Sequence, residues 1–142
     1  MNFSIKFLDK QTNSNFQIGE ITMNDYSEKF QSSLSYWNKA NYVDQWKDGV
    51  QRLFNGNNRS CLVTSMLDPN ISSYICLWLL YTEKNIVHIQ NQILFLEELN
   101  EPFDESRIYY YISDREIIDE DGHKISEWDI QIDDLKVFLD SY

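Results

Sequence analysis

Three polar residues alternate along an otherwise apolar stretch of the sequence and could together form a small polar site. His88, Gln90 and Gln92 are spaced two positions apart, which places their side chains on one face of a β-strand. An imidazole beside two carboxamides could bind a polar ligand or transfer a proton. The alternative, which we favour, is a histidine whose hydrogen bonds are satisfied on the surface of a sheet.

The sequence lacks the motifs that are typical of catalysis or metal binding. The four glycines stand alone, so there is no glycine-rich phosphate loop. His88, His123 and the two cysteines lack the spacing of a zinc site. The acidic run 119–122 ends in a glycine, but Ile117 occupies the position where an EF-hand loop needs an oxygen ligand. We therefore predict that the protein is not an enzyme and holds neither a metal nor a cofactor.

The last third of the chain carries all of its net negative charge. Residues 1–96 contain eight acidic and eight basic side chains, whereas residues 97–142 contain fifteen acidic and four basic ones. A field of one sign attracts a basic partner and raises its association rate. The same field repels nucleic acid and anionic membranes, so we expect neither as a partner. The alternative is an acidic surface that serves solubility alone.

Aromatic and acidic residues are interleaved between positions 109 and 129. Tyrosines provide large contact areas in protein interfaces, and carboxylates around them can pair with Lys and Arg of a partner. Alternatively, the tyrosines belong to a strand of the core and the acids to a solvated turn. The candidate contact residues are Tyr109, Tyr111, Asp114, Glu116, Asp119, Glu120, Asp121, Glu127 and Asp129.

The first half of the chain predicts two short strands followed by two helices. Phe3, Ile5 and Phe7 alternate with polar residues, as in a half-buried strand, and residues 16–21 resemble a second one. Helical spacing of apolar residues then predicts a helix over 25–37, capped by Asp25. A second helix is expected from Asn41 to residue 54, before Asn55-Gly56.

The second half predicts an antiparallel sheet. Strands are expected over 61–67, 71–81, 86–96 and 108–112. The connections between them are too short for parallel crossovers, so neighbouring strands should be antiparallel. Asp121-Gly122 is a preferred pair for a tight hairpin turn, here between 115–119 and 124–132. Asp133 can cap a closing helix.

These elements together predict an α+β fold spanning residues 1–142 as a single domain. It would contain a largely antiparallel sheet of about five to seven strands, two helices in the N-terminal half and one C-terminal helix.

The sequence also indicates the compartment. Cys61 and Cys76 lie within apolar runs, where cysteine behaves as a small buried hydrophobe, so we expect no disulfide. The N-terminus lacks the basic and apolar regions of a signal peptide. The longest apolar run, Tyr74–Tyr81, is eight residues long, against the roughly 20 needed to span a bilayer. We expect a cytoplasmic protein.

Several segments resemble the immunity proteins of bacterial contact-dependent growth inhibition (CDI) systems. The segments, which follow one another in the expected order from about Phe30 onward, are Tyr36–Trp46, Trp78–Tyr81, Val87–Ile89, Asp121–Trp128 and the closing stretch from Asp133 to Leu139. Their shared features are structural aromatics and turns, so no contact residue is carried over from the family.

The resemblance implies a partner. Such proteins are encoded beside a large effector whose C-terminal domain is a toxin, often a nuclease, and they bind and block that domain in the cytoplasm. The expected partner is a cognate toxin domain with a basic surface, as a nuclease needs to hold phosphates. Two other functions stay open: a small enzyme or ligand-binding domain with a site at His88, Gln90 and Gln92, and an acidic adaptor without a toxin.

Overall fold

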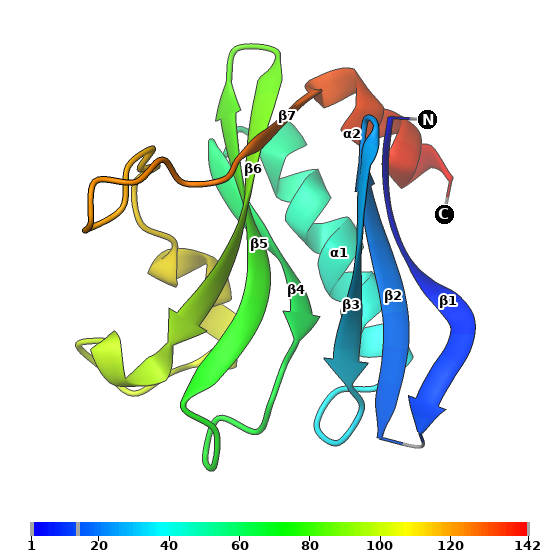
Figure 1. The fold of residues 1–142 in the computed structure, drawn as a ribbon, viewed down its shortest axis with the longest axis vertical. Helices are drawn as coiled ribbons and strands as arrows, with labels where there is room; N and C mark the ends of the chain where they lie inside the picture. Colours follow the sequence, from blue (N-terminus) through cyan, green and yellow to red (C-terminus); the bar gives the residue numbers. More distant parts are fainter. Residues whose placement is uncertain (1, 14, 142) are drawn as a thin grey trace.

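A computed structural model of the protein describes residues 2–13 and 15–141. Seven strands, two α-helices and two 3₁₀ helices follow one another along the chain in this part (Figure 1). They are β1 (Phe3–Asn13), β2 (Phe16–Met23), β3 (Tyr26–Ser33), α1 (Lys39–Phe54), β4 (Arg59–Ser65), β5 (Tyr74–Glu83), β6 (Ile86–Phe95), η1 (Leu96–Glu98), η2 (Glu105–Tyr111), β7 (Trp128–Gln131) and α2 (Ile132–Asp140). No helix in the described ranges is long and apolar enough to cross a membrane.

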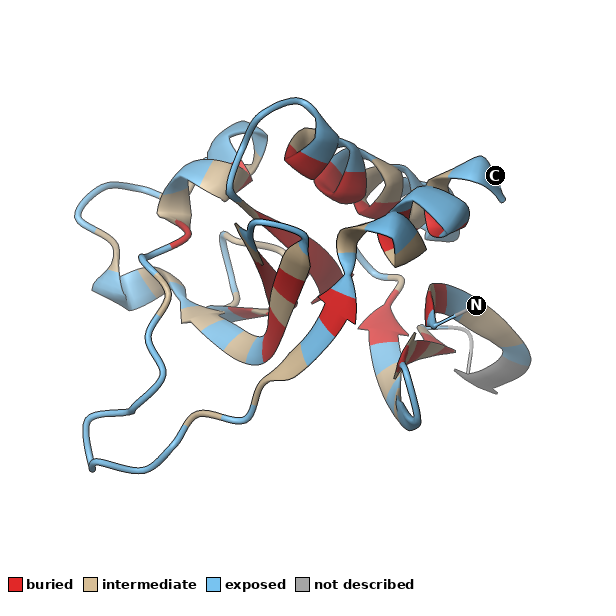
Figure 2. Cartoon of the chain, turned by 90° about the horizontal axis from the view of Figure 1, so that it is seen from above, coloured by how far each residue is buried: buried red, intermediate tan, exposed pale blue. Residues whose placement is uncertain are grey.

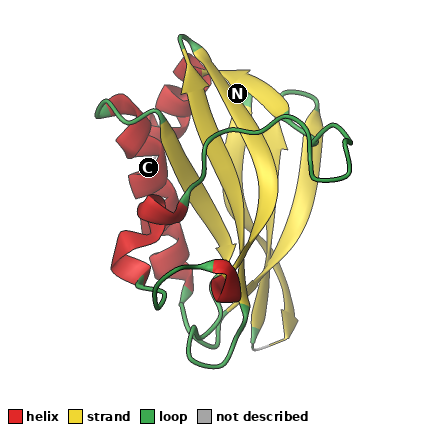
Figure 3. Cartoon of the chain, turned by 90° about the vertical axis from the view of Figure 1, so that its left-hand side faces the viewer, coloured by secondary structure: helices red, strands yellow, loops and turns green. Residues whose placement is uncertain are grey.

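The strands form two antiparallel sheets, one in the order β1-β2-β3 and one in the order β4-β5-β6-β7. The α+β class and the antiparallel pairing predicted from the sequence are therefore confirmed. The sheets meet where β3 passes β4, and the Ser32 hydroxyl donates a hydrogen bond of 2.5 Å to the carbonyl oxygen of Thr64. Figure 3 shows the strands as a layer with both α-helices on one side.

Helix α1 packs closely on β4. It begins with a capping box, in which Asn38 and Asn41 each accept a hydrogen bond from the other's backbone. Trp46 is fully buried, and its indole N–H donates a 2.7 Å hydrogen bond to the carbonyl oxygen of Val63 in β4. A Cβ atom at Gly49 would lie 2.4 Å from the carbonyl oxygen of Cys61, so only glycine allows this approach.

The main core lies between the helices and the sheets (Figure 2). Phe138 of α2 packs edge-on against Phe3 of β1, with ring centroids 5.5 Å apart. Tyr26 of β3 stacks on Trp128 of β7 at 4.7 Å, which joins the two sheets at a second point. Cys61 and Cys76 are both free cysteines, as expected.

The segment from η1 to residue 127 covers the opposite face of the second sheet. Ile108 and Ile112 are buried against that face, where Leu77 and Leu79 alternate with the core residue Trp78 along β5. Most of the segment beyond residue 112 is exposed (Figure 2). The acidic third of the chain is therefore a cover for the sheet rather than a detached tail.

The helix predicted over 25–37 is wrong, because residues Tyr26–Ser33 form strand β3 instead. This strand pairs with β2 along its whole length. The turn between them places Asn24 at a φ of 57°, a conformation that asparagine tolerates. Pairing with β2 places the Phe30 ring over Gly19, where a Cβ would lie 2.4 Å from it. Long-range packing therefore overrides the local helical spacing.

The strand predicted over 108–112 is also wrong, since residues Glu105–Tyr111 form the 3₁₀ helix η2. The Asp104 carboxylate begins this helix by accepting a 3.0 Å hydrogen bond from the backbone N–H of Ser106. A 3₁₀ turn buries Ile108 and Ile112 together against the sheet. A strand would point these two residues the same way but leave Tyr110 buried with them, whereas Tyr110 is 69% exposed.

The Asp121-Gly122 turn is confirmed, but its arms are shorter than predicted. The Gly122 N–H donates to the carbonyl oxygen of Asp119 at 3.1 Å, and Gly122 has a φ of +82°. The arms pair at one bridge, between Ile118 and Lys124. The chain then leaves the turn to form β7, which pairs with β6 and buries Ile130. Helix α2 follows with Gln131 as its N-cap, so Asp133 lies in the first turn rather than at the cap.

We predict that Trp46→Ala strongly destabilises the protein. Removing a buried Trp costs about 3–5 kcal/mol of unfolding free energy, out of the ~5–15 kcal/mol typical of a domain. Urea denaturation measures this change, and Ile71→Ala, at a side chain that is 87% exposed, is the control with little effect. A Trp46→Ala protein with the wild-type denaturation midpoint would contradict the core assignment.

Candidate functional site

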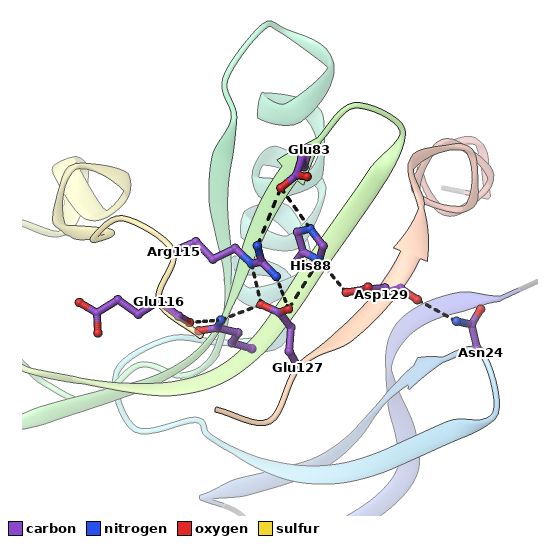
Figure 4. Close-up of polar contacts among 8 residues, drawn as sticks. Asn24, Glu83, His88, Arg115, Glu116, Glu127 and Asp129 are labelled. Atoms are coloured by element: carbon purple, nitrogen blue, oxygen red, sulfur yellow. Dashed lines mark hydrogen bonds and ion pairs between the residues drawn. The ribbon is translucent and has the colours of Figure 1, made fainter. Parts of the chain in front are cut away.

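A network of charged and polar side chains connects β6, β7 and the segment before the Asp121-Gly122 turn (Figure 4). The Arg115 guanidinium donates two hydrogen bonds to the Glu127 carboxylate, from Nε at 2.8 Å and from Nη2 at 2.5 Å. Gln90 of β6 donates to the same carboxylate at 2.8 Å and to the carbonyl oxygen of Glu116 at 2.9 Å. The network therefore fixes residues 115–127 to the strand.

His88 extends the network toward β7 and the first sheet. Its Nδ1 lies 2.7 Å from Oδ1 of Asp129 and 3.6 Å from Oε1 of Glu127. Glu83 lies 3.8 Å from both His88 and Arg115. The backbone carbonyl of Asp129 accepts a 2.9 Å hydrogen bond from the amide of Asn24 in the β2–β3 turn (Figure 4).

The charges in this network stabilise one another. Glu127 is largely buried, with a side chain that is 13% exposed. The hydrogen bonds from Arg115 lower the pKa of Glu127, and the pKa of Arg115 is raised by the same contact. Two opposite charges that are hydrogen-bonded and partly desolvated hold each other in the ionised state.

The geometry favours a structural network over a catalytic or metal site here. His88 and Gln90 are brought together as their spacing predicted, but their polar atoms are used by Asp129, Glu127 and the backbone. The Gln92 amide donates a 3.5 Å hydrogen bond to the amide oxygen of Gln90. Ligand atoms of His88, Glu127 and Asp129 lie close enough for a cation, yet both oxygens of Glu127 already accept hydrogen bonds from Arg115.

The second acidic group, around the Asp121-Gly122 turn, is organised by its own backbone. Asp119, Asp121 and His123 also bring possible ligand atoms together, and all three are exposed. Oδ1 of Asp119 accepts the backbone N–H groups of Asp121 and His123, each at 2.9 Å. Asp119 is therefore a residue that shapes the turn.

The remaining predicted acids divide into paired and projecting groups. Asp114 pairs with Arg59 at 2.5 Å. Figure 4 shows the Glu116 side chain pointing away from the network. Within residues 2–13 and 15–141, no ion pair or hydrogen bond engages the carboxylates of Glu116, Glu120 and Asp121, which are all exposed. Among the predicted acids, these three project from the surface with carboxylates that make no hydrogen bond or ion pair in the described residues.

The two candidate tyrosines hold η2 in place. The Tyr109 hydroxyl donates a 2.6 Å hydrogen bond to Asp48 of α1, and the Arg52 guanidinium lies 4.0 Å from the centre of its ring. Burial and the bond to Asp48 raise the pKa of Tyr109. The Tyr111 hydroxyl accepts the backbone N–H of Asp104 at 2.8 Å.

The exposed tyrosine of this segment is Tyr110, which is not among the contact residues predicted from the sequence. Its side chain is 69% exposed, with the Arg107 guanidinium 4.3 Å from the ring centre. A strand would have placed Tyr109 and Tyr111 on one face. Only the change to a 3₁₀ helix brings Tyr110 outward, and no local sequence signal distinguishes the two conformations.

A groove of about 910 Å³ lies between β6 and the segment 111–126. We call it the acidic groove, because its lining includes Glu98, Asp114, Glu116, Asp119, Glu120 and Asp121. Lys124 is the one basic side chain of the described residues that lines it. Its floor is apolar and includes Leu77, Leu79 and Ile112. An apolar floor with a charged rim is the usual composition of a protein-binding surface.

We predict that Glu127→Gln destabilises the protein in a pH-dependent way. At pH 7 the loss should be about 1.5–3 kcal/mol, as for hydrogen bonds to a charged group. Because the folded pKa of Glu127 lies below its ordinary value of 4.5, the wild-type advantage exists above that value. It disappears as the pH falls through the folded pKa.

Urea denaturation of both proteins at pH 7 and at progressively lower pH measures this difference. Glu120→Gln removes an equal charge from an exposed position, and should leave the free energy of unfolding nearly unchanged. An advantage of the wild type over Glu127→Gln that stays constant as the pH falls would show that the ion pair with Arg115 is not its source.

Residues 32–138 match the family model of the CdiI N-terminal domain. The Immunity protein CdiI of Enterobacter cloacae is 36% identical over 126 residues, which cover 89% of this chain and 84% of that protein. A chain of the CdiA-CT/CdiI toxin and immunity complex from Enterobacter cloacae superposes with a TM-score of 0.89 at 32% identity, over 98% of this chain and 97% of that one. The resemblance seen in the sequence is thus confirmed, and the chain belongs to the CdiI family of CDI immunity proteins.

Proposed function

We propose that this protein binds and neutralises the toxic C-terminal domain of a cognate CDI effector by stoichiometric, non-covalent association. The observation that carries the proposal is the match to the Enterobacter proteins along almost the whole chain. The similar solved structure comes from a complex of toxin and immunity protein. That structural match covers 98% of this chain.

The chemistry of the acidic groove supports a basic partner surface. Six acids line it against one lysine, and three of those acids, Glu116, Glu120 and Asp121, project without partners in the described part of the chain. A toxin that cleaves nucleic acid must present basic side chains to phosphates. We therefore propose that the toxin is a nuclease, and that the acidic surface keeps this protein itself from binding nucleic acid or an anionic membrane. It would act in the cytoplasm, where such a toxin meets its substrate.

Inhibition by binding requires no catalytic group of the inhibitor. The cluster of His88, Glu127 and Arg115 is hydrogen-bonded within its own chain and holds the acidic segment in place. We therefore propose that the protein acts as an inhibitor and not as an enzyme. This interpretation also differs from the adaptor alternative, because it requires one toxin molecule to be silenced by one molecule of this protein.

We predict stoichiometric inhibition. The purified C-terminal domain of the effector encoded beside this protein should cleave RNA or DNA, and titration with the protein should abolish cleavage at a molar ratio near one. Complete inhibition far below equivalence would indicate that the protein modifies the toxin enzymatically. Cleavage that continues at excess inhibitor, without complex formation in size-exclusion chromatography, would contradict the proposed function.

We predict that the three projecting acids accelerate binding. The triple variant Glu116→Gln, Glu120→Gln and Asp121→Asn should lower the association rate by about tenfold at low salt, because electrostatic steering contributes a factor of at least that size. It should also flatten the salt dependence of the rate. Surface binding kinetics at low and moderate salt measure both effects.

The matched control removes three acids outside the groove, with the variant Asp9→Asn, Asp25→Asn and Asp44→Asn. These residues are exposed on β1, on the β2–β3 turn and on α1, so the change in net charge is identical. The control should associate nearly as fast as the wild type. Equal effects of the two triple variants would show that net charge, and not the groove, determines the rate.

A further inference from the structure

Strand β6 has an outer edge that is only half used. Its inner edge pairs with β5 along the whole strand, from Ile86 to Phe95. Its outer edge pairs with β7 only from Ile86 to Ile89. From Gln90 to Phe95, no strand in the described part of the chain pairs with the outer edge.

Two hydrogen bonds establish which backbone groups face this open edge. The Ile132 N–H donates to the carbonyl oxygen of Asn85 at 2.9 Å, on the β7 side. The Leu96 N–H donates to the carbonyl oxygen of Ser73 at 2.9 Å, on the β5 side. Because hydrogen-bonded positions alternate along an antiparallel strand, odd-numbered residues of β6 direct their N–H and C=O groups outward. Asn91, Ile93 and Phe95 therefore present a continuous row of backbone donors and acceptors beyond the end of β7.

A hollow lies on each face of this edge. The acidic groove includes Asn91, Ile93 and Phe95 in its lining and has Glu116 and Glu120 on its far wall. A second hollow of about 520 Å³ opens toward β3, and its lining includes Phe30 of β3, Trp78 of β5 and the same part of β6. Side chains of an added strand would alternate between the two hollows.

The edge also offers apolar contacts. Ile93 and Phe95 are 48% and 47% exposed. Tyr74 lies directly opposite Phe95 on β5 and is 40% exposed, so the three side chains form one apolar row on the face of the second hollow. Exposed apolar residues at the centre of a polar surface are typical anchors of protein interfaces.

Edge strands are usually protected against pairing by charges, prolines or bulges. The edge strand β1 is protected in this way, because it contains the charged residue Lys6 and its pairing with β2 is irregular between Phe7 and Gln11. The segment Gln90–Phe95 contains no charged residue and no proline. An unprotected edge beside two hollows is suited to accept a partner strand.

We propose that an extended segment of the toxin domain adds to the outer edge of β6 at Asn91–Phe95, continuing the sheet beyond β7, with basic side chains in the acidic groove. This inference rests on the proposed function and specifies its interface. A second copy of this chain is a poor occupant, because it would bring the same acids, with a net charge of −11 per chain, against the groove. Strand addition of this kind takes affinity from main-chain hydrogen bonds and specificity from alternate side chains.

Hydrogen exchange of the protein, alone and in complex with the toxin domain, tests the inference without any variant. The amides of Asn91, Ile93 and Phe95 should exchange rapidly in the free protein and become protected in the complex. The amides of Gln90, Gln92 and Leu94, which face β5, should be protected in both states and serve as internal controls.

Two variants test the same edge by affinity. Ile93→Pro removes an outward N–H at a position where an edge strand tolerates proline, and Ile93→Lys places a charge beside a basic partner. Each should weaken toxin binding by about tenfold or more, the loss expected for an interfacial hydrogen bond or a repelled charge. Val137→Lys on α2, where Val137 is 49% exposed, is the control of equal exposure and should bind normally.

The outcomes separate this inference from the proposed function. A toxin complex in which the three outward amides stay unprotected would overturn the strand-addition proposal while the inhibitor function stands. Failure of the cognate toxin domain to bind at all would overturn both. A free protein that is dimeric, with these amides already protected, would show that the edge is occupied by a second copy and would overturn the proposal as well.

Discussion

The ion pair between Arg115 and Glu127 is the interaction on which the shape of the acidic groove depends. It joins the beginning and the end of the exposed segment around the Asp121-Gly122 turn, and Gln90 of β6 donates hydrogen bonds to Glu127 and to the carbonyl oxygen of Glu116. The segment is thereby fixed to the sheet at Gln90, and the following part of β6 stays open. The acidic groove occupies the space between them. Without this ion pair, residues 115–127 would still carry the same charges, but they would not be held against the sheet to form the acidic groove.

The acids of the C-terminal third have two different tasks. Asp114 and Glu127 pair with arginines, Asp129 contacts His88, and Asp119 accepts backbone N–H groups of its own turn. They shape and hold the segment, since a hydrogen-bonded carboxylate loses its freedom to follow a partner. Glu116, Glu120 and Asp121 retain that freedom and contribute the field that a partner meets. The number of acidic residues on a surface is therefore larger than the number whose carboxylates are free to pair with another protein.

Much of the fold could be predicted from local patterns, because the β4–β5–β6 meander and helix α1 have clear periodicity and short connections. The error at β3 has a physical origin: Tyr26 and Phe30 are four positions apart, which places them on one face of a helix and equally on one face of a strand. Only pairing with β2 decides between the two. The 3₁₀ conformation of residues 105–111 depends likewise on Ile108 and Ile112 packing on a distant sheet.

The candidate site could be predicted in its location but not in its detail. Charge segregation pointed to the acidic third, where the groove lies. The partners that bind individual acids are far away in the sequence: Arg59 pairs with Asp114, and His88 contacts Asp129. Likewise, the open edge of β6 follows from where β7 ends, which depends on the register of two strands about 40 residues apart.

The central claim is that the acidic groove beside the open edge of β6 is the surface that holds the toxin. Zero-length carbodiimide cross-linking of the complex, followed by mass spectrometry, tests this claim most directly, because it joins carboxylates to lysines that touch them. We expect cross-links from Glu116, Glu120 and Asp121 to lysines of the toxin domain. Cross-links confined to acids outside the groove, such as Asp25 and Asp44, would contradict it.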